Sequence, residues 1–326
     1  MDWADRIGRR LKLRDLHILL SVVQCRSMAK AARQLAVSNP VVSKSIADLE
    51  HTLGVRLLDR SPQGVEPTIY GRALLDRGIV AFDELRQAVR HVEFLADPTA
   101  GEVRVATTTA IATSFCCAVL DHLVRQYPRI VVHILTGDAS ATYRDLDQRK
   151  VDMVIARLFA PASEDHMLAE NLYDEPQVVA VGEQSPWVGR RKIALADLVD
   201  EVWTLPPVDS LSGAIIAEAF RANGLDLPRA TVITTTVPMR KVLVATGRFT
   251  SIVPAPLRMA AQSPAIKTLP IDLPTTRRPI AVVTLKNRTV SPVAQVFIDC
   301  AREVGKSLTK SMMTKTPVRG VALYER

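Results

Sequence analysis

The feature that most constrains this chain is a break in helical periodicity near its N-terminus. Apolar residues recur at the spacing of one helix face before the break and resume it afterwards: Ala29, Ala31, Ala32, Leu35 and Ala36, then Val42, Ile46, Leu49 and Leu53. Ser38 or Asn39 can cap the second helix, and Pro40 suits its first turn because the N–H that proline lacks would be unpaired there. Residues 27–46 therefore predict two short helices joined by a tight turn.

Side chains at the start of the second helix suit the edges of DNA bases. The small alanines before the turn allow two helices to cross closely, as in a helix-turn-helix. An Asn amide can pair with adenine, a Lys can reach guanine or phosphate, and apolar atoms of Pro40 or Val41 can touch a thymine methyl. We expect DNA contacts from the following residues: Ser38, Asn39, Pro40, Ser43 and Lys44. The alternative is an ordinary helical hairpin whose second helix is solvated.

The residues after the second helix predict a short hairpin wing. Gly54 can end the helix, and a turn-forming segment, Ser61–Gly64, follows the basic segment Arg56–Arg60. In such a wing, Arg56 and Arg60 would lie against the phosphate backbone beside the groove. We therefore add these two arginines to the expected DNA contacts.

The segment from Leu11 to Thr68 resembles the winged helix-turn-helix of LysR-type transcriptional regulators. The matching residues are Ala31, Ala32, Leu35, Ser38, Pro40, Ser43, Ile46, Leu49, Glu50, Leu53, Gly54, Leu57, Arg60, Thr68 and Gly71. The family usually has Gln where this chain has Asn39, which keeps the amide but shortens its reach. The resemblance implies a sequence-specific regulator that binds double-stranded operator DNA as a homodimer or homotetramer and contacts RNA polymerase when it activates. It also implies control by a small-molecule effector.

Length and composition agree with that resemblance. The chain has 326 residues and 48% hydrophobic content, enough for two or three domains with cores. It contains no run of about 18 apolar residues and opens with charges instead of a secretion signal, so we expect a cytoplasmic protein without a membrane partner. Its four cysteines lack metal-ligand spacing and are expected to be reduced core residues, with no metal and no cofactor. The cysteines are Cys25, Cys116, Cys117 and Cys300.

The net charge of +8 is concentrated at the two ends of the chain. Residues 1–70 hold eleven Lys and Arg against seven Asp and Glu, and residues 302–326 hold six against two. The middle is therefore neutral, as expected for a basic DNA-binding module attached to a body that binds small molecules. We expect residues 308–326 to be a flexible basic tail.

Residues 69–96 predict one long linker helix. They contain no proline, and an apolar stripe runs along them: Leu75, Ile79, Phe82, Leu85, Val89 and Val92. Leu75, Phe82 and Val89 repeat every seven residues, so we expect the helix to pair with its copy in a dimer. The alternative is that the stripe packs against the chain's own winged domain.

Strands alternating with helices from residue 101 to residue 307 predict a parallel α/β architecture. The resemblance implies two lobes like those of type 2 periplasmic binding proteins: lobe one at about 101–160 and 279–307, and lobe two at about 168–271. The full prediction is an α plus α/β chain, with a winged helix-turn-helix at 11–68, the linker helix, and this effector-binding domain.

The polar residues at strand ends suggest an anion site between the lobes, because crevices form at the carboxyl ends of parallel strands and helix N-termini attract anions. The expected effector contacts are Thr107, Thr108, Thr109, Thr136, Asp138, Arg157, Ser210 and Thr236. The alternative is that the threonines, Ser210 and Asp138 are ordinary helix caps.

Other classes of protein fit the sequence less well. The six histidines lie outside any HExxH or triad-like motif, and neither a G-x-S-x-G nor a phosphate-binding loop is present, so we do not expect an enzyme. A solute-binding transport protein would need an export signal and no winged domain. A constitutive architectural DNA binder remains open, and it predicts no small-molecule effect on DNA binding.

Overall fold

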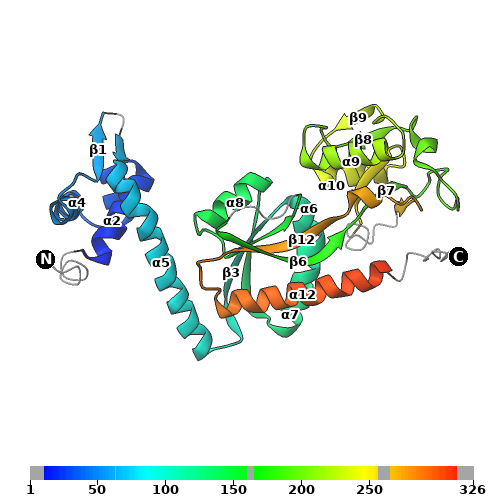
Figure 1. Ribbon diagram of the computed structural model, residues 1–326. Coiled ribbons are helices and arrows are strands. Elements are labelled where there is room, and N and C mark those ends of the chain that lie inside the picture. Colours follow the sequence, from blue (N-terminus) through cyan, green and yellow to red (C-terminus); the bar gives the residue numbers. More distant parts are fainter. Residues whose placement is uncertain (1–10, 63, 160–164, 256–264, 314–326) are drawn as a thin grey trace, which may run out of the picture. The chain divides into compact units, whose positions relative to one another are not determined.

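The structure is a computed structural model that describes residues 11–62, 64–159, 165–255 and 265–313 (Figure 1). The chain divides into two compact units, residues 1–86 and residues 87–326. The linker helix α5 (Ile69–Ala96) contributes residues to both units. Each unit has its own hydrophobic core, so each is described separately.

The N-terminal unit contains the predicted winged helix-turn-helix. Its elements are α2 (Leu13–Cys25), α3 (Met28–Gln34), α4 (Asn39–Leu53), β1 (Leu58–Ser61), β2 (Gly64–Pro67) and the first part of α5. The hydroxyl of Ser27 caps α3 by accepting from the backbone N–H of Lys30 at 3.3 Å. Ser38 is the N-cap residue of α4, Pro40 lies in its first turn, and Gly54 ends it with a φ of 73°. The expected helix starts and stops are confirmed.

Several residues of the family motif hold the wing on the helices. A carboxylate oxygen of Glu50 accepts from the backbone N–H groups of Leu57, at 2.7 Å, and Leu58, at 3.3 Å. The hydroxyl of Thr68 donates to the carbonyl of Arg56 at 2.7 Å and accepts from the N–H of Gly71 at 3.1 Å. These bonds fix the hairpin against the end of α4, and their loss would free the wing.

The linker helix corrects one part of the sequence reading. Leu75 is buried in the N-terminal core and Phe82 packs against it, so two of the three heptad positions belong to the winged domain, as the alternative proposed. Ile79 is half-buried, and four apolar residues further along α5 are exposed: Leu85 (46%), Val89 (57%), Val92 (67%) and Leu95 (71%). A dimer seam would therefore have to use the C-terminal half of the helix.

Lobe one of the second unit is built on a five-stranded sheet in the order β4-β3-β5-β12-β6. The strands are β3 (Ala100–Thr107), β4 (Arg129–Thr136), β5 (Met153–Arg157), β6 (Met167–Glu175) and β12 (Arg278–Leu285). β3, β4 and β5 are parallel, and β12 runs antiparallel to β5 and β6. One core packs α7 (Cys117–Gln126) and α12 (Pro292–Met313) on the sheet, and a second core packs α8 (Ala139–Asp147) on it.

Lobe two contains a three-stranded sheet, β10-β7-β11, and a parallel pair, β8-β9. An isolated bridge between Trp203 and Thr250 links the two. The strands are β7 (Gln177–Gly182), β8 (Trp203–Leu205), β9 (Ala230–Ile233), β10 (Ser251–Pro254) and β11 (Ile266–Thr268). Helices α9 (Leu211–Ala222) and α10 (Val237–Ala245) complete the lobe, together with the short η2 (Leu195–Leu198).

The boundary between the lobes differs from the expected one. Residues 168–175 were assigned to lobe two, but β6 is an edge strand of the first sheet, so the chain crosses between Glu175 and Gln177. The strand was missed because its exposed run, residues 168–171, contains both apolar and polar side chains and shows no strict alternation. The return crossing lies between β11 and β12, around the single turn η3 (Pro274–Thr276), where the sequence placed it.

The C-terminal tail also begins later than expected. Helix α12 continues to Met313, and Leu308 is buried in the core of lobe one. Residues 308–313 are therefore part of the folded domain, because apolar contacts hold the helix beyond the point where its composition turns basic. The rest of the predicted tail, residues 314–326, lies outside the described residues.

Candidate functional site

The N-terminal turn of α4 presents the expected DNA-contacting residues. Ser38, Asn39, Pro40 and Lys44 are exposed, and Ser43 is half-buried. The opposite face of the same helix carries Val42, Ile46 and Leu49, which are completely buried. A helix held in this way by its apolar face presents its polar residues outward at fixed positions, as base reading requires.

The wing places Arg56 and Arg60 at its surface. Both side chains are exposed, and Arg60 lies on β1, whose only buried residue is Leu58. Among the described residues, Arg56, Arg60 and Lys44 have no acidic partner, so their charges are free to meet phosphate. The backbone carbonyl of Arg26, at the turn between α2 and α3, accepts from the N–H of Val65 at 3.2 Å and ties the wing to that turn.

The three threonines after β3 do not form one hydroxyl cluster. Thr107 is completely buried, and its hydroxyl donates to the carbonyl of Ile155 at 2.7 Å. This bond ties β3 to β5, so we assign Thr107 a structural role. Thr108 precedes the helical turn α6 (Thr109–Ile111), and Thr109 is exposed. The helix continues through a π-helical turn, η1 (Ala112–Cys116), into α7.

Two of the expected effector contacts are helix caps. The carboxylate of Asp138 accepts from the N–H of Ala141 at 2.7 Å and from the hydroxyl of Ser140 at 2.8 Å, which lowers the pKa of Asp138. The hydroxyl of Ser210 caps α9 by accepting from the N–H of Gly213 at 3.1 Å. The capping alternative therefore accounts for both. Thr136 and Thr236 are exposed, and their contact with an effector stays a prediction.

Arg157 is not free at the end of β5. Its side chain is 11% exposed and forms an ion pair with Glu175, which is buried at the end of β6. The hydroxyl of Tyr173 donates to the other carboxylate oxygen of Glu175 at 3.0 Å. Burial is the main cause that lowers the pKa of Arg157 to about 10. Tyr173 raises this pKa, and the positive charge of Arg278 lowers it. Arg157 therefore remains protonated at neutral pH.

Two further arginines near Arg157 were missed by the sequence reading. Arg278 opens β12, pairs in register with Glu175, and lies 3.8 Å from a carboxylate oxygen of Glu218. Arg240 comes from α10 in lobe two, is 2% exposed, and donates to the carbonyl of Ile252 at 2.9 Å. A sequence signal for Arg240 did exist, because it interrupts the apolar face formed by Val237 and Val244.

The lobes touch close to these arginines. Helical turn α6 contacts α10, and Ala110 packs against a small core formed by residues of lobe two. That core comprises Ala180, Val237, Val244 and Val253. The N–H of Gln177, where the chain enters lobe two, donates to the hydroxyl of Thr276 on the returning segment at 3.1 Å. Both crossing segments are thus joined at the junction.

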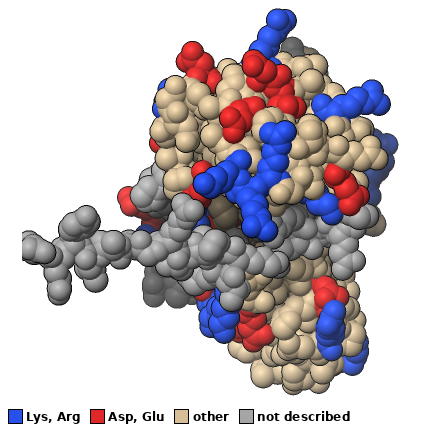
Figure 2. All heavy atoms as spheres, turned by 90° about the vertical axis from the view of Figure 1, so that its right-hand side faces the viewer, with Lys and Arg blue, Asp and Glu red and all other residues tan. Residues whose placement is uncertain are grey.

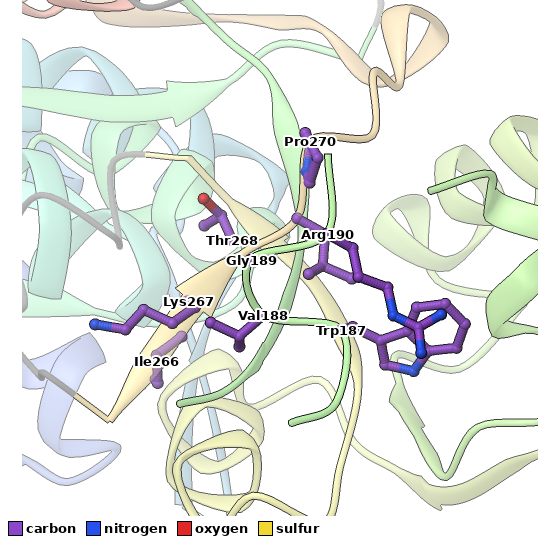
Figure 3. A pocket seen from close by; sticks show the side chains of 9 residues that line it. Trp187, Val188, Gly189, Arg190, Ile266, Lys267, Thr268 and Pro270 are labelled. Atoms are coloured by element: carbon purple, nitrogen blue, oxygen red, sulfur yellow. The ribbon is translucent and has the colours of Figure 1, made fainter. Parts of the chain in front are cut away.

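Two cavities in the second unit lie apart from the threonines. One of about 360 Å³ is lined by Phe159, by Arg278 and by one face of α9. The other, of about 320 Å³, lies between β11 and residues 187–190 (Figure 3). In that cavity the guanidinium of Arg190 stacks on Trp187, 4.5 Å from the ring centre. None of the expected effector residues lines either cavity.

The surface charge and the cysteines complete the picture. On the face shown in Figure 2, basic and acidic side chains are interspersed, in keeping with the neutral middle of the sequence. All four cysteines are free. Cys116 and Cys300 are buried, and Cys25 is half-buried and packs against the core of the N-terminal unit. Cys117 is exposed, so the core assignment was wrong for this residue. No helix in the described parts of the chain is long and apolar enough to cross a membrane.

Comparison with known proteins gives matches over most of the chain. Residues 13–72 match the bacterial regulatory helix-turn-helix of the lysR family, and residues 96–306 match the LysR substrate binding domain. The regulator GbpR of Azospirillum brasilense is 27% identical over 303 residues, covering 90% of this chain and 86% of its own. TdcA of Escherichia coli is 23% identical over 292 residues, covering 90% and 93%.

Solved structures share the fold. Full-length OxyR from Pseudomonas aeruginosa aligns with a TM-score of 0.65 at 20% identity, covering 92% of this chain and 96% of its own. Full-length CbnR, solved in complex with its target DNA, aligns with a TM-score of 0.54 at 23% identity, covering 90% and 100%. Both similarities extend over the winged domain and the two-lobed domain together.

Proposed function

Since the chain belongs to the LysR family of DNA-binding transcriptional regulators, we propose that α4 reads its operator and that an anionic effector bound between the two lobes controls the response. In this proposal, Asn39, Ser43 and Lys44 meet base edges in the major groove. Arg56 and Arg60 meet the phosphates beside it. The protein acts in the cytoplasm and contacts RNA polymerase when it activates.

The arrangement of α4 is the observation that supports this assignment most directly. Its apolar face is completely buried, while Ser38, Asn39 and Lys44 are exposed at its cap and over its first two turns, and Lys44 has no acidic partner among the described residues. These are the side-chain types that pair with base edges. CbnR, which shares the fold, was solved on its target DNA, and that supports the same orientation of the winged domain here.

The exposed half of the linker helix supports a homo-oligomer. Leu85, Val89, Val92 and Leu95 are apolar, and their spacing places them on neighbouring turns of α5. A second copy of the same helix would cover them, and two winged heads on a symmetric dimer would require paired half-sites in the operator. An effector that binds one arrangement of the lobes better than another would shift the placement of the heads.

Substitution of Lys44 tests the recognition helix. Lys44→Ala should weaken operator binding by about 1–3 kcal/mol, roughly 5- to 150-fold, because one base or phosphate contact is lost. Fluorescence anisotropy with an operator duplex and a scrambled duplex at one fixed salt concentration measures the change. Lys192→Ala, an exposed lysine of the second unit, is the matched control and should bind normally. Equal operator affinity for Lys44→Ala and the unmodified protein would remove Lys44 from the interface.

Effector control has its own test. A footprint of the operator, taken with and without candidate anionic metabolites from the pathway of the regulated genes, should change in extent when the effector is present. An unchanged footprint together with unchanged promoter output across the panel would favour the architectural DNA binder.

A further inference from the structure

Helix α2 ends at an arginine whose backbone is left-handed. Arg26 has a φ of 49°. Its N–H donates to the carbonyl of Val23 at 3.2 Å, and the next N–H, that of Ser27, donates to the carbonyl of Val22 at 3.3 Å. These two bonds form the Schellman ending of a helix, and glycine usually occupies the left-handed position because a Cβ is strained there. The turn itself therefore does not require an arginine.

The side chain of Arg26 makes no contact that would explain its presence. It is exposed, and no hydrogen bond or ion pair joins it to another described residue. Arg149 provides the contrast, because it has a φ of 54° but is 8% exposed and donates from its guanidinium to the carbonyl of Asn287 at 3.4 Å. Packing accounts for the arginine at position 149. At position 26, the described contacts account for the backbone alone.

The turn that carries Arg26 lies against the wing. Its carbonyl accepts from the N–H of Val65 at 3.2 Å, and Val65 pairs in register with Arg60 across the hairpin. A Cβ placed on Gly64 would lie 2.9 Å from the carbonyl oxygen of Arg26 and 3.9 Å from its Cβ. Strand β2 therefore has Arg60 beside it on β1 and Arg26 beside it on the other edge. Both arginines are exposed.

We propose that Arg26 binds a phosphate of the DNA backbone beside the wing. The inference rests on the proposed function, in which Arg56 and Arg60 meet phosphates, and it adds a contact from the end of α2. A guanidinium presents paired N–H donors that match phosphate oxygens. Because the carbonyl of Arg26 is bonded to Val65, a phosphate held by Arg26 also fixes the wing on the DNA backbone. Such a contact raises affinity for every sequence and reads no base.

The test compares full-length Arg26→Gly with the unmodified protein. Glycine fits the left-handed turn, so the variant removes the side chain and keeps the backbone. Fluorescence anisotropy with a duplex of random sequence, over a series of NaCl concentrations, measures the binding constant. Loss of one phosphate contact should reduce the slope of log K against log salt by about 1 and weaken binding about fivefold to tenfold near 0.1 M salt. An operator duplex should lose the same factor.

Calorimetry of the same preparations separates a phosphate contact from a structural role. The Tm of Arg26→Gly should equal or exceed that of the unmodified protein, because the strain of a left-handed Cβ is relieved. Arg149→Gly is the matched control: it should lower the Tm, since a buried side chain is lost, and leave DNA binding unchanged. Arg26→Lys keeps the charge and should keep the salt slope of the unmodified protein. Arg60→Ala is the reference for loss of a wing contact.

Three results would overturn the proposal. The first is an unchanged slope and affinity in Arg26→Gly. The second is a loss confined to the operator duplex, which would make Arg26 a base contact. The third is weaker DNA binding together with a fall in Tm as large as that of Arg149→Gly, which would make Arg26 a structural residue.

The reference variants show whether the proposed function fails as well. If Arg60→Ala and Lys44→Ala also bound both duplexes normally, the proposed orientation of the winged domain would be wrong. If these two variants lost affinity as expected and Arg26→Gly did not, only the contact from Arg26 would be wrong.

Discussion

The winged domain and the effector domain place their charged groups in opposite ways. On α4 and the wing, the charges of Lys44, Arg56 and Arg60 are exposed, and the buried face is apolar. In the second unit, Glu175 and Arg240 are buried, and the side chain of Arg157 is 11% exposed. An exposed charge lowers the stability of the fold very little, and it can meet a large, highly charged partner such as DNA. A buried charge is stable only when neighbouring groups compensate it, and it can be reached only by a small partner.

The comparison also shows which residues stabilise each site. In the winged domain, polar groups such as Glu50 and Thr68 bond to the backbone and leave the side chains that we propose to contact DNA free. In the effector domain, Arg157 and Glu175 pair with each other, and Arg157 is also one of the proposed effector contacts, so stability and effector binding would depend on the same atoms there. In the first unit, a substitution should therefore change either stability or DNA binding. In the second unit, one substitution should change both stability and effector binding.

The largest expected effect comes from the junction. Glu175→Gln should lower the free energy of unfolding of the second unit by about 3–5 kcal/mol, because Arg157 is left as an unpaired buried charge. Urea denaturation followed by tryptophan fluorescence measures it, since Trp187 and Trp203 both lie in lobe two. The control is Glu218→Gln. Glu218 is exposed and pairs with Arg278, so this substitution should lower the free energy of unfolding by less than about 1 kcal/mol. If both variants lost the same free energy of unfolding, the expected difference between buried and exposed charges would be wrong.

A smaller loss of stability is expected when Glu50, which bonds to the backbone of the wing, is replaced. Glu50→Ala removes two hydrogen bonds from a carboxylate to backbone N–H groups and should destabilise this contact by about 2 kcal/mol. Hydrogen exchange of the segment 54–62 should become faster, and operator affinity should fall because the wing loses its fixed position. Asp48→Ala, an exposed neighbour on α4, should change neither measurement. An unchanged exchange rate in Glu50→Ala would mean that the wing is held by its other contacts alone.

The smallest effect concerns the turn between α3 and α4. Ala36 has a φ of 53°, a left-handed conformation in which its Cβ is strained. Ala36→Gly should raise the free energy of unfolding by about 0.5–1 kcal/mol, the relief of strain exceeding the added freedom of the unfolded chain. Ala29→Gly, within α3, should lower it by about 1 kcal/mol. Calorimetry of the two variants gives opposite shifts in Tm, and shifts of the same sign would show that the turn is not strained.

Much of the winged domain could be predicted because its signals are local. The apolar spacing of α3 and α4, Pro40 in the first turn and Gly54 at the end are determined by residues within a few positions of one another. The effector domain was predictable in its alternation of strands and helices but not in its partition. β6 shows no strict alternation of apolar and polar residues, and only its pairing with β12, more than a hundred residues later, makes it part of lobe one.

The sequence by itself determined the two helices of the helix-turn-helix, the wing, the alternating α/β elements and the exposed residues that we propose to contact DNA, because helix capping and apolar periodicity act over short distances. The tertiary structure decided which charges are buried together. It turned Asp138 and Ser210 into caps, packed Leu75 and Phe82 into and against the winged core, and paired Arg157 with Glu175. Burial and charge pairing depend on packing between distant segments, and no local pattern of residues carries that information.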